Sequence, residues 1–166
     1  MTYFELFEIP FSLLVDVQQL SKKYFELSRK YHPDFHTHAD DASQERALEM
    51  TSLLNKAWKT FKDPQATLRY ALTLKGLLDG EEKHQLSPDF LMEMMDINEQ
   101  LSEEDASSHP SILEALVKME KAIYEPVKAT LEHYDESTTS QEQLLEVKEY
   151  YFRKKYLDRI RQRLVN

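Results

Sequence analysis

The sequence predicts an all-α protein, for three reasons. Only two of its 166 residues are glycine, so the glycine-rich loops that cradle phosphates or dinucleotides are missing. The chain is rich in Leu, Glu, Lys, Gln and Ala, which lose little side-chain freedom in a helix. Apolar residues recur at steps of three and four positions, the spacing of one helix face.

The first half of the sequence predicts an antiparallel helical hairpin with short flanking helices. Asp16 is expected to cap the first hairpin helix, and Pro33 ends it because the residue before a proline avoids helical dihedrals. The polar stretch that follows predicts a loop before the second hairpin helix. Asp63 and Pro64 open a further helix. The four helices are expected over residues 3–7, 16–31, 42–62 and 64–78.

The second half predicts a three-helix bundle behind a linker. Asp79-Gly80 and Pro88 mark the linker at residues 79–87, which divides the chain into domains of residues 1–78 and 88–166. Pro126 predicts a kink or break in the middle helix. The three helices are expected over residues 89–104, 110–134 and 140–164.

Composition excludes several classes of function. The chain has no cysteine, so it forms no disulfide, thiolate metal site or cysteine nucleophile. Its net charge of −9 argues against a protein that coats nucleic acid. The first residues lack a secretory pattern and no apolar run is long enough for a membrane span, so we expect an intracellular protein. The charge is uneven: residues 1–79 hold 10 basic and 11 acidic side chains, whereas residues 80–166 hold 11 and 19.

The tripeptide His32-Pro33-Asp34 is the most distinctive motif. It lies in the hairpin loop, directly after a helix whose basic residues outnumber its two acidic ones. Taken alone, it is equally a proline-stopped turn beside a solvated basic helix face. The basic residues of that helix are Lys22, Lys23, Arg29 and Lys30.

The wider pattern resembles the J-domain family, which stimulates ATP hydrolysis by DnaK-type chaperones. The matching stretches occur in family order at residues 3–10, 30–34, 54–58, 63–64 and 69–70. The resemblance implies an activator that is not itself an enzyme. It also implies that His32, Pro33, Asp34 and the basic helix with Lys22, Lys23, Arg29 and Lys30 bind the chaperone's ATPase domain. Phe35 departs from the pattern, because many members carry a basic residue there.

The rest of the chain resembles HscB-type co-chaperones of iron–sulfur cluster assembly, through residues 69–76, 90–96 and 156–161. This resemblance implies an L-shaped molecule whose three-helix bundle binds an IscU-type scaffold protein and delivers it to an HscA-type chaperone. It implies no cofactor and no metal. Some eukaryotic members have an N-terminal cysteine metal site, which this chain cannot form without cysteine, so we expect a cytoplasmic, bacterial-type member. Carried over by position, the scaffold-binding residues are Leu91, Met92, Met95, Asp96, Glu99, Glu103 and Tyr156.

The residues themselves give a compatible picture of this patch. Residues 88–105 hold seven acidic and no basic side chains. At 100° per residue, Leu91, Met92 and Met95 point to a flank beside Asp96 and Glu99. The inward face consists of Phe90, Met94, Ile97 and Leu101. The alternative is a wide core stripe on a solvated acidic helix. Residues 148–163, with seven basic and two acidic side chains, could also offset this acidity from within the bundle.

Three other functions would each use part of the sequence. A metal or acid–base site would use the histidines and aspartates of the hairpin loop, but no rigid frame or helical ligand spacing supports it. The remaining histidines, His84 among them, are most simply solvated. A generic J-domain protein that delivers unfolded clients is the runner-up to the scaffold-specific one, and a nucleic-acid binder would need the basic helix to act alone. The loop residues in question are His32, Asp34, His36, His38, Asp40 and Asp41.

Overall fold

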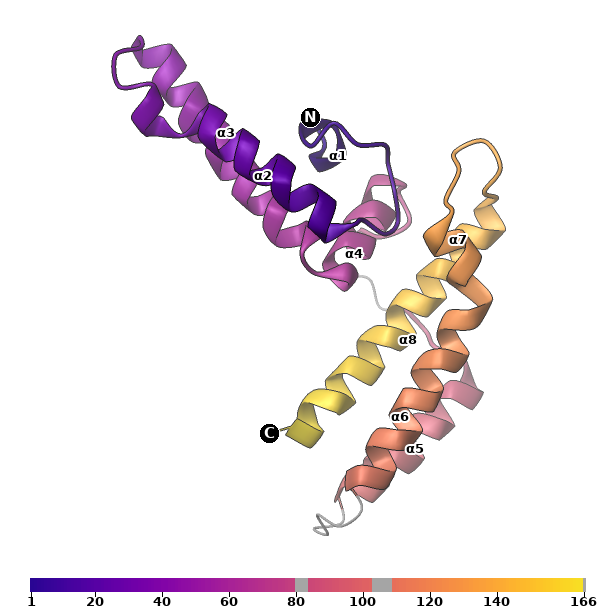
Figure 1. Ribbon diagram of the computed structural model, residues 1–166. Coiled ribbons are helices and arrows are strands. Elements are labelled where there is room, and N and C mark those ends of the chain that lie inside the picture. Colours follow the sequence, from indigo (N-terminus) through magenta and orange to yellow (C-terminus); the bar gives the residue numbers. More distant parts are fainter. Residues whose placement is uncertain (80–83, 103–108, 166) are drawn as a thin grey trace. The chain divides into compact units, whose positions relative to one another are not determined.

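The computed structural model describes residues 1–79, 84–102 and 109–165, and throughout these ranges it consists of helices and their connections (Figure 1). The all-α prediction is therefore confirmed. The chain forms two compact units, Met1–Leu74 and Lys75–Asn166. The domain limits at residues 78 and 88 stay predictions. None of the described helices is both long and apolar enough to cross a membrane.

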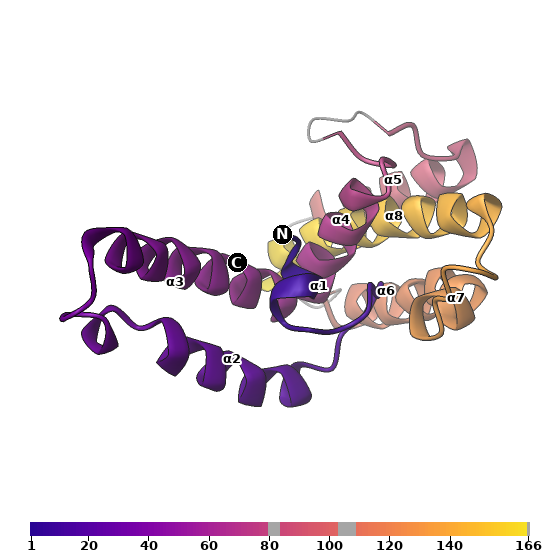
Figure 2. The ribbon, with the colours of Figure 1, turned by 90° about the horizontal axis from the view of Figure 1, so that it is seen from above.

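The first unit is built on the antiparallel pair α2 and α3, which run side by side in both views (Figures 1 and 2). Asp16 caps α2 as predicted, since its carboxylate accepts from the backbone N–H groups of Gln18 and Gln19. Asp40 caps α3 in the same way. The elements are α1 (Tyr3–Leu6), α2 (Val17–Tyr31), the 3₁₀ turn η1 (Pro33–Phe35), α3 (Asp41–Phe61) and α4 (Pro64–Leu74).

The helix α4 ends at Leu74, so its predicted extension to Leu78 was wrong. Gly76 has a φ of +73°, the left-handed conformation that commonly terminates a helix. No neighbouring atom lies within 4 Å of the place where a Cβ would stand on Gly76. Glycine at this position is therefore explained by the left-handed backbone conformation, and not by another group packing closely against it.

Aromatic rings hold α1 against the hairpin. Phe7 meets Phe61 edge to face with ring centroids 5.3 Å apart, and Tyr3 stacks on Tyr70 of α4 at 4.3 Å. Tyr24 of α2 stacks on Trp58 of α3 at 4.9 Å, which ties the two hairpin helices together. Trp58, like Met50 and Tyr31, is half-buried. The large buried side chains of this unit include Phe4, Phe7, Leu13, Leu54, Phe61, Leu68 and Leu72.

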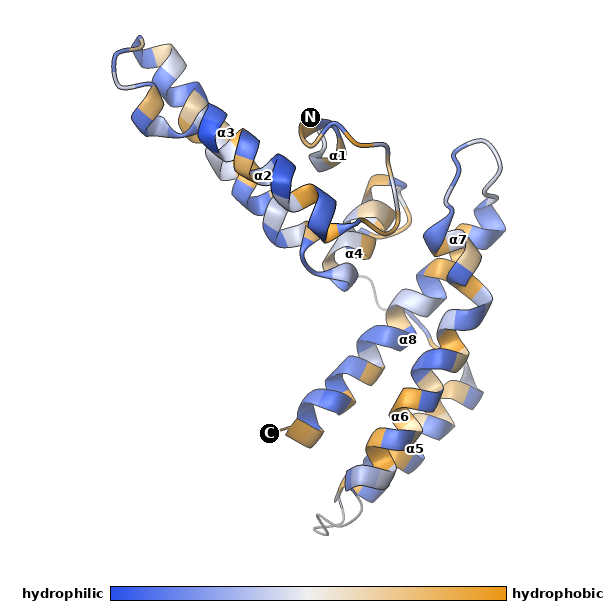
Figure 3. Ribbon diagram, viewed as in Figure 1, coloured by the Kyte–Doolittle hydropathy of each residue, from blue (hydrophilic) through white to orange (hydrophobic). Residues whose placement is uncertain are grey.

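The second unit contains the three predicted helical stretches. The middle one breaks at Pro126, as expected, because a 3₁₀ turn interrupts it there. Apolar side chains from α5, α6 and α8 form one core, and Figure 3 shows hydrophobic positions along α5 and α6. The elements are α5 (Pro88–Ser102), α6 (His109–Tyr124), η3 (Glu125–Val127), α7 (Lys128–Glu132) and α8 (Gln141–Val165). The buried core residues are Phe90, Met94, Ile97, Ile112, Leu116, Leu157 and Ile160.

Candidate functional site

The His-Pro-Asp loop lies at the junction of α2 and η1. His32 ends α2 with extended backbone angles, φ −61° and ψ 130°, and its ring Nδ1 accepts from the backbone N–H of Asp34 at 3.2 Å. Pro33 opens η1, where a missing N–H costs nothing because the first N–H groups of a helix have no helical partner. His32 as the cap and Pro33 as the first residue of η1 therefore suit the local backbone, in addition to any role that the motif has in binding.

Two side chains outside the motif hold this loop to the hairpin. The hydroxyl of Thr51 on α3 donates to the carbonyl of Tyr31 at 2.9 Å, and the His36 ring Nε2 lies 3.0 Å from the carbonyl of Lys30. Both carbonyls belong to the last turn of α2, where no helical N–H is available to them. The sequence analysis missed both contacts and considered His36 only as part of a metal or acid–base site.

The motif's side chains are open to solvent. The His32 side chain is 47% exposed and that of Asp34 is 84% exposed. Phe35, which stands where many relatives carry a base, is also exposed and meets the His32 ring edge to face at 6.2 Å. A partner can therefore contact all three side chains without unfolding the loop.

The four predicted basic residues of α2 are not equivalent. Lys22, Arg29 and Lys30 are exposed, and none of the three forms an ion pair within the described ranges. Lys23 instead donates to the Glu8 carboxylate at 2.6 Å. That hydrogen bond raises the pKa of Lys23 and lowers the pKa of Glu8. Part of the predicted basic surface is thus already neutralised inside the unit.

The predicted division of α5 into an inward and an outward face is confirmed. Met94 is fully buried, whereas Leu91, Met92 and Met95 are 37%, 65% and 69% exposed. Asp96 and Glu99 are exposed beside them, and neither forms an ion pair in the part of the chain that the structure describes. Glu103 lies outside the described residues.

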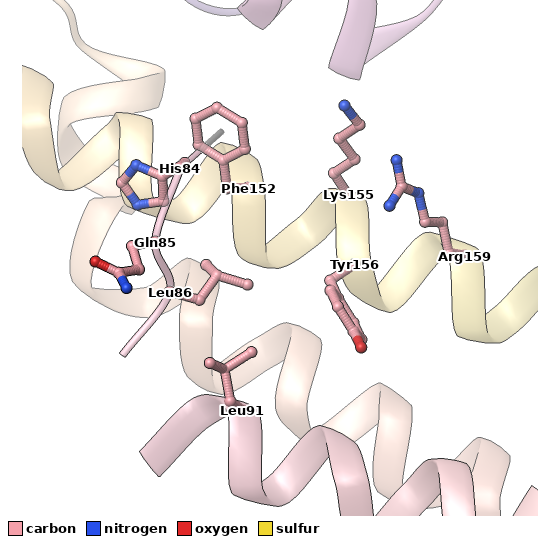
Figure 4. A pocket seen from close by; sticks show the side chains of 8 residues that line it. All are labelled: His84, Gln85, Leu86, Leu91, Phe152, Lys155, Tyr156 and Arg159. Carbon is pink, nitrogen blue, oxygen red and sulfur yellow. The ribbon is translucent and has the colours of Figure 1, made fainter. Parts of the chain in front are cut away.

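Tyr156 of α8 joins this surface. Its ring meets that of Phe90 edge to face at 6.3 Å. Leu91 and Tyr156 line the same open pocket, with a volume of about 390 Å³ (Figure 4). The structure thus brings together two residues that are 65 positions apart in sequence and that the resemblance assigned to one site.

Among the described residues, three basic side chains of α8 pair with carboxylates that do not belong to α5. Their ion pairs, over the residues described, run to α6 or within α8 itself: Arg161 with Glu120, Lys154 with Asp158, and Arg153 with Glu149. This stretch contacts uncharged side chains of α5: Arg163 Nη1 donates to the Asn98 side-chain oxygen at 2.6 Å, and the Arg153 guanidinium lies 5.1 Å from the centre of the Phe90 ring. The exposed carboxylates of Asp96 and Glu99 on α5 are therefore available to pair with basic groups of a partner.

His84 is not solvated, contrary to expectation. Its ring stacks on Phe152 with centroids 4.5 Å apart and bonds to the Glu149 carboxylate. Burial pushes the pKa of Glu149 up, but the hydrogen bonds from His84 and Arg153 outweigh it and leave that pKa below its ordinary value. The segment before α5 is thereby attached to α8.

No group of three or more His, Asp or Glu side chains in the described ranges is arranged to hold an ion.

Both units match known protein families. Residues 2–71 match the DnaJ domain family, and residues 86–165 match the HSCB C-terminal oligomerisation domain family. The crystal structure of human co-chaperone protein HscB is similar over 99% of this chain and 80% of its own, with a TM-score of 0.81 and 27% identity. Chaperone HscB from Vibrio cholerae has a similar fold, with a TM-score of 0.73 and 23% identity over 99% and 95% of the two chains.

Proposed function

The chain belongs to the HscB-type J-domain proteins, the co-chaperones of iron–sulfur cluster assembly, and from that premise we propose a specific division of labour. The first unit stimulates the ATPase of an HscA-type, DnaK-like chaperone. The second unit binds the IscU-type scaffold protein and delivers it to that chaperone. Holding both partners on one chain raises their effective concentration for each other and so promotes cluster transfer.

The observation that carries this proposal is that each unit presents an exposed set of side chains outside its buried core. On the first unit, His32 and Asp34 are exposed beside Lys22, Arg29 and Lys30. A basic face of this kind steers association with an acidic surface and raises the on-rate. The Asp34 carboxylate can pair with an arginine of the chaperone, a charge-assisted contact that is stronger than a neutral hydrogen bond.

On the second unit, the exposed methionines of α5 support the scaffold-binding role. Exposed Met92 and Met95 contribute nothing to the bundle core, and flexible, polarisable methionines are typical of protein-binding surfaces. Asp96 and Glu99 beside them favour a partner that brings lysine or arginine. This arrangement favours one folded partner with a complementary face over the generic delivery of unfolded clients.

Single-turnover ATP hydrolysis by the DnaK-type chaperone tests the first half. We expect His32→Gln to abolish the stimulation. His38→Gln is a matched control, because His38 is an exposed histidine of the same loop and we assign it no role. Normal stimulation by His32→Gln would refute the assignment, and equal loss in both variants would show that the loop as a whole, and not His32, is responsible.

Titration with the IscU-type scaffold tests the second half. We expect Asp96→Lys and Glu99→Lys to weaken binding, whereas Glu93→Lys should not, because Glu93 lies on the flank of α5 toward α6. Unchanged binding in the first two variants would rule out this surface as the scaffold site.

A further inference from the structure

The pocket that Leu91 and Tyr156 share has an apolar wall and a basic rim. Figure 4 shows Leu86, Leu91 and Tyr156 converging from the segment before α5, from α5 and from α8. Lys155 and Arg159 extend from α8 on the side away from α5, and both line the pocket. The sequence analysis considered these two cations only among the seven basic side chains of residues 148–163 that could offset the acidity of α5.

Among the described residues of the unit, Lys155 and Arg159 have no carboxylate partner for their charge. They are one helical turn apart, both are exposed, and neither takes part in an ion pair among the described residues. Their basic neighbours behave differently, since Arg153, Lys154 and Arg161 are each paired with a carboxylate of the same unit. Among the described basic residues from 153 to 161, the two that line the pocket are thus the ones available to an external anion.

The other edge of the surface carries the opposite charge. On α5, Leu91 lines the pocket and Asn98 accepts from Arg163 of α8, which fixes the side of α5 that faces α8. At 100° per residue, Met95 lies next around the helix, and Glu99 and Asp96 follow at the far flank. The exposed surface therefore runs from basic on α8, through an apolar centre, to acidic on α5.

We infer that this surface is a polarised docking site, in which Lys155 and Arg159 bind carboxylates of the partner while Asp96 and Glu99 bind its lysine or arginine side chains. An apolar side chain of the partner fills the pocket between them. The inference rests on the proposed scaffold-binding function and specifies the occupant as a segment of the scaffold with acidic and basic groups on opposite edges of an apolar centre. Such a pattern permits one orientation, because reversing the segment would place like charges together.

Isothermal titration of the IscU-type scaffold from the same genome into the full chain tests this inference. An exposed ion pair contributes up to about 1 kcal/mol, or about fivefold in Kd, and charge reversal adds repulsion to the loss of the pair, so Lys155→Glu and Arg159→Glu should each weaken binding about fivefold. Lys121→Glu is the matched control, since Lys121 is an exposed base on α6 outside the pocket, and it should bind as the wild type does. Lys155→Gln, which removes the charge without reversing it, should bind the scaffold with an affinity between those of the wild type and Lys155→Glu.

The outcomes separate the two proposals. Weakening in either reversal beyond that of Lys121→Glu supports the polarised site. If Asp96→Lys weakens binding but both reversals on α8 leave it unchanged, the polarised site is wrong and the scaffold-binding function stands. If the wild-type chain binds no scaffold, the proposed function fails and this inference fails with it. Far-ultraviolet circular dichroism of each variant verifies that the helices are retained.

Discussion

Three methionines within one turn of α5 give a direct test of which face of the helix stabilises the bundle. Met94 is fully buried in the core formed with α6 and α8, whereas Met92 and Met95 are 65% and 69% exposed. Truncating a buried methionine to alanine costs about 2 to 5 kcal/mol, because it loses transfer free energy and leaves a cavity. An exposed substitution changes stability by about 0.5 kcal/mol or less. Urea unfolding followed by circular dichroism measures the difference between Met94→Ala and the other two variants.

Binding to the scaffold should show the reverse order, because Met92→Ala and Met95→Ala should weaken it more than Met94→Ala does. Complete burial of a methionine side chain is worth about 1.5 to 3 kcal/mol, and about two-thirds of Met92 or Met95 remains to be buried, which gives about 1 to 2 kcal/mol or 5- to 30-fold in Kd. Met94→Ala should bind with nearly unchanged affinity at a temperature where it is folded. The reasoning is refuted if Met95→Ala destabilises the bundle as much as Met94→Ala, or if neither exposed truncation weakens binding.

Three further predictions concern stability. Thr51→Val keeps the side-chain shape but removes the hydroxyl that donates to the Tyr31 carbonyl, so urea unfolding should show a loss of about 1 kcal/mol, and wild-type stability would contradict this. Gly76→Ala places a side chain at a φ of +73° and should lower stability by about 1 to 2 kcal/mol by calorimetry; a higher Tm would argue against that strain. Glu149 has a pKa below its ordinary 4.5 in the folded state, so its stabilising effect is present above that pH and is lost as the pH falls through the lowered pKa. Glu149→Gln should therefore be less stable than wild type at neutral pH and approach it in acid, whereas a constant difference at all pH values would exclude this coupling.

The features of the fold that could be predicted are those governed by neighbours in sequence. The cap at Asp16, the break at Pro126 and the inward face of α5 each follow from local backbone rules or helical periodicity, and the structure confirms them. The end of α4 was misjudged because Leu77 and Leu78 continue the apolar spacing. A single glycine in the left-handed conformation outweighs that pattern.

The candidate site divides in the same way. Helical spacing predicted that Met92, Met95 and Asp96 would be exposed, and they are. The pairing of Lys23 with Glu8 and of His84 with Glu149 could not be predicted, because the partners are 15 and 65 positions apart and meet only through tertiary packing. The same holds for Lys155 and Arg159, whose availability depends on which of their basic neighbours find carboxylates on α6 and α8.

The packing of Trp58 determines what an optical measurement on this protein reports. Trp58 is the sole tryptophan of the chain, and it lies between α2 and α3, stacked on Tyr24 with the ammonium of Lys62 5.8 Å from its ring centre. Its fluorescence emission is therefore a local signal from the hairpin that carries the His-Pro-Asp loop, whereas helical ellipticity comes from both units. Fluorescence and ellipticity midpoints that coincide would indicate that the two units unfold in one cooperative transition, and separated midpoints would indicate that each unfolds independently.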